Sequence, residues 1–219
     1  LIVHRELVVR QRVNMTNHIR GTLREYGITI PAGVNEFWKA ALEKIAQLDN
    51  PVLRDCLHSS LVMAKSLKEK ELEIEGYLET LLKENPEAIR LRKVPGIGLL
   101  TAAMLIAVTD DVSRFKNSKE FASYLGLTPS EHSSGDKRRM GGITRSGSEI
   151  LRRYLIHGAR NNLNYSTVND KDPNRRWARQ VKERAGFNKA VVALAHRTAR
   201  IAYNMMKNES NYQPIARAA

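Results

Sequence analysis

The 219-residue sequence contains a single cysteine, few aromatic residues (6%) and no long apolar run. One cysteine, Cys56, excludes an intrachain disulfide framework and a cysteine-rich zinc site, and it favours a reducing compartment. No apolar stretch approaches the roughly 18 residues of a membrane span, and the first residues lack the pattern of a signal peptide. We therefore expect a cytoplasmic protein with no membrane partner.

Acidic side chains are also in short supply. The chain has 36 Lys and Arg against 23 Asp and Glu, which gives a net charge of +13 and a pI near 10.0. The excess is concentrated between Glu131 and Arg200, where 16 basic residues face 6 acidic ones. Such a segment favours a polyanionic partner, and we prefer nucleic acid over the alternative of a merely soluble basic protein.

Apolar residues recur at helical spacing along most of the chain, and no alternating strand pattern of useful length occurs. Glycine follows three of the predicted helices, at Gly27, Gly126 and Gly186, where it is a common stop signal. We predict an all-α fold without strands. The expected helices are Leu1 to Tyr26, Asn35 to Leu48, Val52 to Lys83, Pro86 to Lys93, Leu99 to Thr109, Ser118 to Gly126, Ser148 to Asn164, Pro173 to Ala185 and Asn188 to Lys207.

The long predicted helix from Val52 to Lys83 carries nine seam positions spaced by four and three residues, of which seven are apolar. The seam is Leu53, Leu57, Ser60, Ala64, Leu67, Glu71, Ile74, Leu78 and Leu81. It suits either a coiled coil between two copies, hence a homo-oligomer, or packing on the first helix of the same chain. The expected organisation is a helical linker or coiled-coil region at 1–84, a compact helical domain at 85–208 and a disordered tail at 209–219.

A tight turn, Val94-Pro95-Gly96-Ile97-Gly98, separates two of the predicted helices in the pattern of a helix-hairpin-helix. Glycines permit positive φ values and let backbone amides come within hydrogen-bond range of a phosphate. We expect Gly96, Ile97 and Gly98 to contact DNA. The alternative is a glycine-capped hairpin that only packs.

The segment from Pro129 to Ser148 joins basic residues to four glycines and several small hydroxyl residues, a composition that supplies phosphate ligands. Its candidate DNA contacts are Lys137, Arg138, Arg139 and Arg145, followed on the next helix by Arg152 and Arg153. Ser134, before Gly135, is a possible nucleophile, although a serine next to glycine is common in turns. The full phosphate-loop string is absent, which argues against ATP, and the sequence indicates no metal site.

The runs VPGIGLLTAAMLIA and RFKNSKEFASYLGLTPSEHSSGDKRRMGGITRSGSEILRRYLIHGARN resemble the C-terminal domain of bacterial insertion-sequence transposases of the IS110 and IS1111 family. The earlier run HRELVVRQRVNMTNHIRGTLREYGITIP resembles the segment that follows the carboxylate domain of that family. The resemblance thus covers nearly the whole chain. It is more specific than the PGIG turn alone.

The resemblance implies that the catalytic groups of the transposase lie on two domains. In that family an N-terminal RuvC-like domain bears a DEDD set of carboxylates that hold Mg²⁺, and a serine of the C-terminal domain is the nucleophile. That serine directly precedes the glycine in the small-residue loop after G-L-x-P, which here is Ser134. The DEDD segment would precede Leu1, so we expect no cofactor in this chain and no strand cleavage by it alone. A structured guide-type non-coding RNA is a second implied partner.

Three functions are compatible with these expectations, the last of them an assembly element that works through the long helix alone. The first is transposition of an insertion sequence, in which this chain binds double-stranded DNA and exchanges strands through Ser134. The alternative is a non-catalytic helix-hairpin-helix module that grips the DNA backbone. Trapping a covalent DNA adduct would separate the first two.

Overall fold

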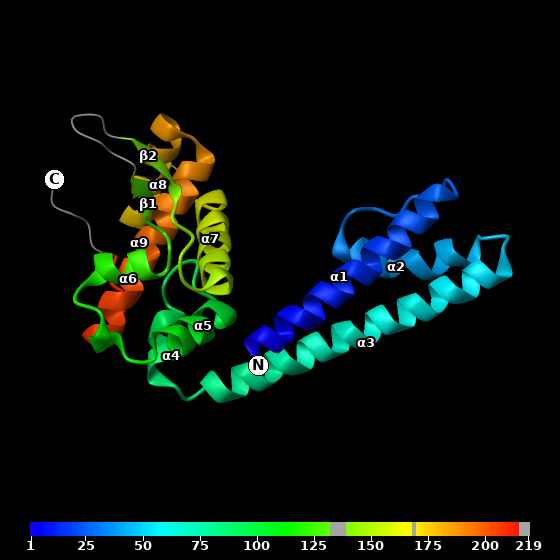
Figure 1. The fold of residues 1–219 in the computed structure, drawn as a ribbon, viewed down its shortest axis with the longest axis horizontal. Helices are drawn as coiled ribbons and strands as arrows, with labels where there is room; N and C mark the ends of the chain where they lie inside the picture. The colour runs from blue at the N-terminus through cyan, green and yellow to red at the C-terminus, as the bar shows by residue number, and fades with distance from the viewer. Residues whose placement is uncertain (132–138, 168–169, 215–219) are drawn as a thin grey trace. The chain divides into compact units, whose positions relative to one another are not determined.

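The computed structural model describes residues 1–131, 139–167 and 170–214. They form a helical protein in two compact units, Leu1–Leu78 (unit 1) and Glu79–Ala219 (unit 2), which are described separately (Figure 1). The helices within the described ranges are α1 (Ile2–Glu25), α2 (Val34–Ala46), α3 (Pro51–Leu82), α4 (Pro86–Leu91), α5 (Leu99–Thr109), α6 (Ser118–Tyr124), α7 (Glu149–Asn164), α8 (Pro173–Ala185) and α9 (Phe187–Lys207), with a 3₁₀ turn η1 (Val112–Arg114). The predicted all-α class is confirmed. The expected domain boundary after residue 84 lies a short way beyond this division.

Unit 1 is built from α1, α2 and most of α3. Its core joins residues of all three helices, including Ile19, Phe37 and Leu57. The seam residue Glu71 is buried, and it accepts hydrogen bonds from Arg5 and Arg12 of α1. Part of the α3 seam therefore faces α1 of the same chain, which favours the intramolecular alternative.

Glycines end three helices as the sequence predicts. Gly27, Gly126 and Gly186 follow α1, α6 and α8, and their φ values are 72°, 67° and 88°. This left-handed backbone is accessible to glycine without the steric cost of a Cβ atom. The helix ends are thus encoded locally.

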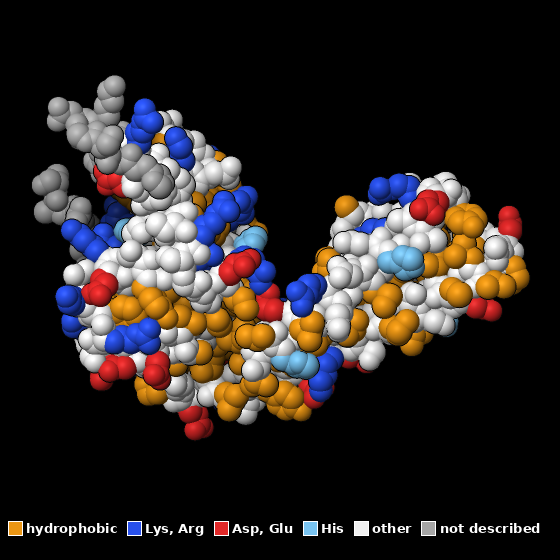
Figure 2. All heavy atoms as spheres, viewed as in Figure 1, with side chains coloured by type: hydrophobic (Ala, Val, Ile, Leu, Met, Phe, Trp, Pro, Cys, Tyr) orange, Lys and Arg blue, Asp and Glu red, His pale blue; other side chains and the backbone are white. Residues whose placement is uncertain are grey.

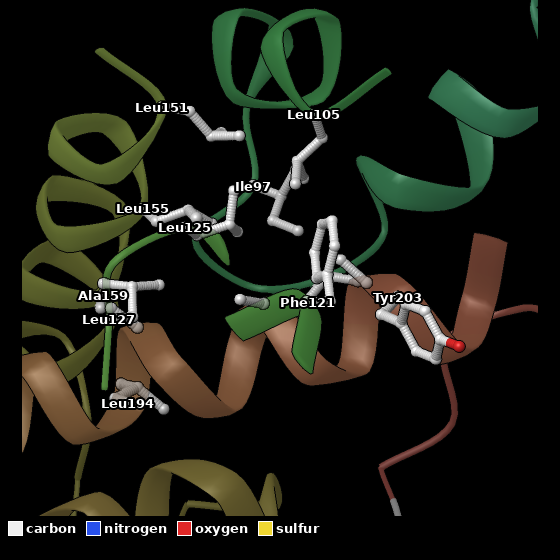
Figure 3. Packing of buried hydrophobic residues seen from close by; sticks show 14 of the residues in the cluster. Ile97, Leu105, Phe121, Leu125, Leu127, Leu151, Leu155, Ala159, Leu194 and Tyr203 are labelled. Atoms are coloured by element: carbon white, nitrogen blue, oxygen red, sulfur yellow. The ribbon is translucent and has the colours of Figure 1, made fainter. Parts of the chain in front are cut away.

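The core of unit 2 is organised on α9, which packs against α6, α7 and α8. Leu194 and Tyr203 of α9 belong to one cluster with Phe121 of α6 and Leu155 of α7 (Figure 3). The Tyr203 hydroxyl donates to the carbonyl oxygen of Phe115 at 2.9 Å, so the polar end of this buried ring is satisfied.

The expectation of a strand-free fold is wrong at one place. Strands β1 (Pro129–Glu131) and β2 (Met140–Ile143) pair antiparallel, with Pro129 opposite Ile143 and Glu131 opposite Met140. The strands are too short, and β2 is too rich in glycine, to give an alternating pattern in the sequence. They are held by pairing with each other, a property that periodicity does not report.

The expected disordered tail is wrong for the part of it that the structure describes. The Tyr212 hydroxyl donates to Asp172 Oδ2 at 2.8 Å and accepts from Asn174 Nδ2 at 3.0 Å. Tyr212 therefore ties the described part of this segment to the start of α8.

Among the described residues, none of the helices combines the length and the apolar character that crossing a membrane requires.

Candidate nucleic-acid interface

A groove with a volume of about 1270 Å³ lies in unit 2 between the β-hairpin, α7, α8 and α9. The described residues contribute four cationic side chains and one carboxylate to its lining. We call it the basic groove, and it is lined by Leu127, Pro129, Gly141, Gly142, Ile143, Arg145, Glu149, Arg152, Arg153, Ile156, His157, Trp177, Asn188, Lys189, Val192, Ala193 and His196. Such a concave cationic surface attracts and concentrates polyanions. Figure 2 shows several separate groups of Lys and Arg side chains on the visible face of unit 2, on the left, with an apolar area below them.

Arg145 projects from a turn whose backbone is held tightly. Its own φ is +59°, an uncommon value for a residue with a Cβ atom. The Arg145 amide donates to the carbonyl of Gly126 at 3.3 Å, and the Thr144 amide donates to Thr128 at 2.9 Å. A Cβ atom on Gly126 would collide with the backbone of Ser146. Because the turn is fixed against the end of α6, Arg145 starts from a rigid base.

Arg152 departs from the sequence prediction. It was expected as a DNA contact, but its side chain is buried, and Nη1 donates to the carbonyl oxygens of Leu125 (3.3 Å) and Ser146 (2.6 Å). The guanidinium therefore joins the end of α6 to the turn that carries Arg145. A one-dimensional pattern places Arg152 and Arg153 together, whereas packing buries the first and exposes the second.

Helix α7 presents the exposed side of the groove. Ser148 caps it, with Oγ accepting from the Leu151 amide at 3.3 Å. Glu149, Arg153 and His157 follow at intervals of four residues and therefore share one face. All three are exposed and line the groove.

Helix α9 contributes the facing wall. Lys189 is exposed, whereas His196, two helical turns further along α9, is half-buried. Burial, followed by the positive charge of Arg200, lowers the pKa of His196 below its usual value. His196 is therefore a neutral hydrogen-bonding group at neutral pH, while Lys189 supplies charge.

The turn between α4 and α5 is built mainly for packing. Gly96 has φ +94°, and a Cβ there would lie 2.9 Å from the carbonyl oxygen of Gly158 on α7. Asn162 Nδ2 donates to the Pro95 carbonyl at 3.0 Å. The two glycines thus let the turn and α7 meet backbone to backbone.

Ile97 is a second correction. Its side chain is buried among Leu105, Leu125 and their neighbours (Figure 3), and its amide donates to the Val94 carbonyl at 2.9 Å. Neither group is available to a phosphate. Gly98, the exposed N-cap residue of α5, remains a candidate contact.

The predicted serine and two predicted cations lie outside the described residues: Ser134, Lys137 and Arg138. The described strands β1 and β2 flank that segment, and Arg139 is exposed directly before β2. Ser130 lies on β1, where its Oγ donates to the Gly142 carbonyl at 3.1 Å.

Several residues of the groove were not predicted from the sequence: His157, Trp177, Lys189 and His196. They come from three helices, and only tertiary packing brings them together. The signal available in the sequence was the four-residue spacing of Arg153 and His157 on one helix face. No group of three or more His, Cys, Asp or Glu that could hold a metal ion occurs in the described part of the chain.

Residues 88–173 match the family model described as Transposase, IS116/IS110/IS902 family. This segment contains the hairpin and α7 side of the basic groove. The α9 side lies beyond it.

Similar proteins extend over more of the chain. The chain is 33% identical over 219 residues to a transposase for insertion sequence element IS1111A from Coxiella burnetii, covering 97% of the chain and 59% of that protein. It is 31% identical over 215 residues to a probable family 20 transposase from Pseudomonas aeruginosa, covering 96% and 63%. A pilin gene-inverting protein of Moraxella lacunata is 40% identical over 73 residues, or 33% of this chain and 23% of that protein. The chain therefore spans less than two thirds of the length of these relatives.

Proposed function

Because this chain belongs to the IS116/IS110/IS902 transposase family, we propose that it is the DNA-handling part of a transposase. In this proposal the basic groove holds the phosphate backbone of double-stranded DNA, and Ser134 is the nucleophile that joins a DNA end to the protein. The observation that carries the proposal is a cationic groove formed largely by the segment that matches the family model.

Charge supports backbone binding. Arg145 and Lys189 are exposed on opposite sides of the groove, and within the described ranges neither side chain is paired with a carboxylate. Exposed cations without internal partners are free to neutralise phosphates and release their counterions. Glu149 is the one carboxylate that the described residues contribute to the lining, and it offsets only part of this charge.

The test is a salt titration of duplex binding. Each phosphate contact contributes about 0.9 to the slope of log affinity against log salt, so Arg145→Ala with Lys189→Ala should lower the slope by about one to two units. The matched control changes Lys39 and Lys65, two exposed lysines of unit 1, to alanine. If the two double variants keep the same slope, the groove is not the DNA site.

The serine assignment rests on the family resemblance, and its chemistry is a transesterification. The Ser134 Oγ–phosphorus bond forms while the bond from phosphorus to one nucleoside oxygen breaks, and the serine proton ends on that oxygen. Cations nearby would stabilise the charge that develops on the phosphate.

Covalent capture of DNA tests the serine. In a protein that joins this chain to a DEDD-type carboxylate domain, Ser134→Ala should abolish the protein–DNA adduct and leave duplex binding within about twofold, because cations and amides dominate phosphate contact. Ser133→Ala is the matched control and should retain the adduct. An adduct in the Ser134→Ala protein would transfer the assignment to another serine.

Persistent failure to trap any adduct, with duplex binding intact, would instead support the non-catalytic binding module.

We also propose a structured RNA as a second partner, because the family resemblance implies one. It would be detected as an RNA that copurifies with the chain and competes with duplex DNA for the groove.

A further inference from the structure

A smaller pocket of about 260 Å³ adjoins the basic groove, because Trp177 and His196 line both. The remaining walls of the pocket come from one face of α9. They are Arg197, Arg200, Ile201 and Asn204. This pocket lies outside the residues that match the family model.

The pocket has the size and the chemistry of a site for one flat heterocycle. Its volume equals the space of roughly nine water molecules, which is enough for a single nucleobase. The Trp177 indole and the Ile201 side chain give it apolar surface. Arg200, Asn204 and the neutral His196 supply donors and acceptors for the edge of a base.

Two planar groups already lie against each other at its wall. The Arg197 guanidinium carbon is 4.7 Å from the centroid of the Trp177 ring. Indole and guanidinium planes are the surfaces on which unpaired bases stack in nucleic-acid complexes. The Arg200 Nε donates to Ser118 Oγ at 3.2 Å, which anchors a second cation at the pocket.

We propose that this pocket binds the base of an unpaired nucleotide whose phosphates lie in the basic groove. The inference rests on the proposed function, because it takes the groove as the backbone site. A paired base cannot occupy the pocket, since both of its faces are covered by the stack. Single-stranded DNA and single-stranded RNA share the required chemistry.

The experiment uses the full chain with Trp38→Phe, which leaves Trp177 as the only tryptophan. A short thymidine oligonucleotide is compared with an abasic oligonucleotide of the same length and phosphate number. The base-containing strand should quench Trp177 fluorescence and bind about tenfold more tightly, because stacking of one base contributes that much affinity. Oligonucleotides of 2′-deoxyuridine and of uridine, which have the same base and length, then show whether the 2′-hydroxyl strengthens binding, which assigns the strand to RNA, or weakens it, which assigns it to DNA.

Two different variants test the pocket, so the result does not depend on whether one of them folds. Trp177→Leu removes the stacking surface, and Asn204→Phe fills the pocket from an exposed position. Each should abolish the advantage of the base over the abasic strand, and Asn204→Phe, at a residue outside the lining of the basic groove, should do so while duplex affinity stays unchanged. Equal affinity of the base-containing and abasic strands in the parent protein would overturn the pocket alone. Loss of both single-strand and duplex binding in the parent would overturn the proposed function itself.

Discussion

Arg152 shows how burial changes the role of a cation. It lies next to Arg153 in the sequence, and both are on α7, yet only Arg153 is exposed. The Arg152 guanidinium donates to two backbone carbonyl oxygens, those of Leu125 and Ser146. Charged hydrogen bonds of this kind contribute more than neutral ones and leave unsatisfied acceptors when they are removed.

We therefore expect Arg152→Met to lower the free energy of unfolding by about 1.5–3 kcal/mol. Arg153→Met, one residue away, should change stability by less than about 0.5 kcal/mol and should reduce the salt slope of DNA binding. Urea unfolding and salt titration of both variants measure the contrast. A stable Arg152→Met protein with a reduced salt slope would restore Arg152 as a DNA contact.

Tyr212 links the C-terminal segment to α8 by a hydrogen bond to the Asp172 carboxylate, which also caps the helix. Asp172 is the N-cap of α8, and its Oδ1 accepts from the Asn174 amide at 2.7 Å while Oδ2 accepts from Tyr212. Burial, then the hydrogen bond to Asp172, raises the pKa of Tyr212 to about 12. The folded state thus keeps the phenolic proton at a pH where the unfolded chain, with a pKa of about 10, loses it.

The sign of this linkage sets a pH window. The contribution of Tyr212 to stability is fully present below about pH 10 and is lost as pH rises toward 12. Tyr212→Phe should cost about 1 kcal/mol at neutral pH, because it removes one buried hydrogen-bond pair. The difference in unfolding free energy between the two proteins should then shrink as the pH rises from about 10 to about 12. Unfolding monitored by circular dichroism at each pH measures it. A difference that is constant with pH would mean that the hydroxyl does not titrate in contact with Asp172.

At the scale of elements, local signals were reliable where one residue decides the geometry. The stops at Gly27, Gly126 and Gly186 all have left-handed backbone, as expected from their position after apolar-periodic segments. The hairpin of β1 and β2 could not be predicted, because its short strands depend on each other. The groove residues Trp177 and Lys189 were missed for a related reason: only the packing of α8 and α9 brings them beside α7.

The seam of α3 shows a third limit of hydrophobic periodicity. Periodicity identifies the buried face of a helix, but it does not identify the element that packs against that face. Glu71 looks like a defect in an apolar seam, yet it is 5% exposed and lies among cations. Arg12 Nε donates to its Oε2 at 2.8 Å, and Arg5 Nη2 to its Oε1 at 3.3 Å. Because Ile74 is also buried within unit 1, a charge at that seam position would disrupt the unit rather than only separate two copies.

Removing Glu71 should therefore be costly. Glu71→Ala leaves two largely buried arginines without their shared carboxylate, and we expect a loss of about 3 kcal/mol in the unfolding free energy of unit 1. Glu73→Ala is the control, because it breaks an exposed pair with Lys70 and should leave the urea midpoint near that of the parent. Unfolding is followed by Trp38 fluorescence in a Trp177→Phe background. Equal midpoints for the two variants would mean that Glu71 is not bound to the α1 arginines in solution.

For the whole molecule, charge and packing divide the chain at the same place. Unit 1 carries 11 Lys and Arg against 10 Asp and Glu, a net of +1, whereas unit 2 carries 25 against 13, a net of +12. Each unit also has a hydrophobic core of its own. Long-range attraction of a polyanion therefore belongs almost entirely to unit 2, because screening confines a charge to a range of about 10 Å at ordinary ionic strength.

A fragment of residues 79–219 should accordingly fold alone and retain duplex binding within about threefold of the whole chain, with the same salt slope. Residues 1–78 should fold as a helical unit and should not bind duplex DNA measurably. Circular dichroism establishes that each fragment is folded before binding is measured. The contrary result is a folded 79–219 fragment that binds duplex DNA more than about tenfold more weakly than the whole chain. A loss of affinity of that size corresponds to at least one phosphate contact at ordinary salt concentrations. That result would show that unit 1 contacts DNA despite its small net charge.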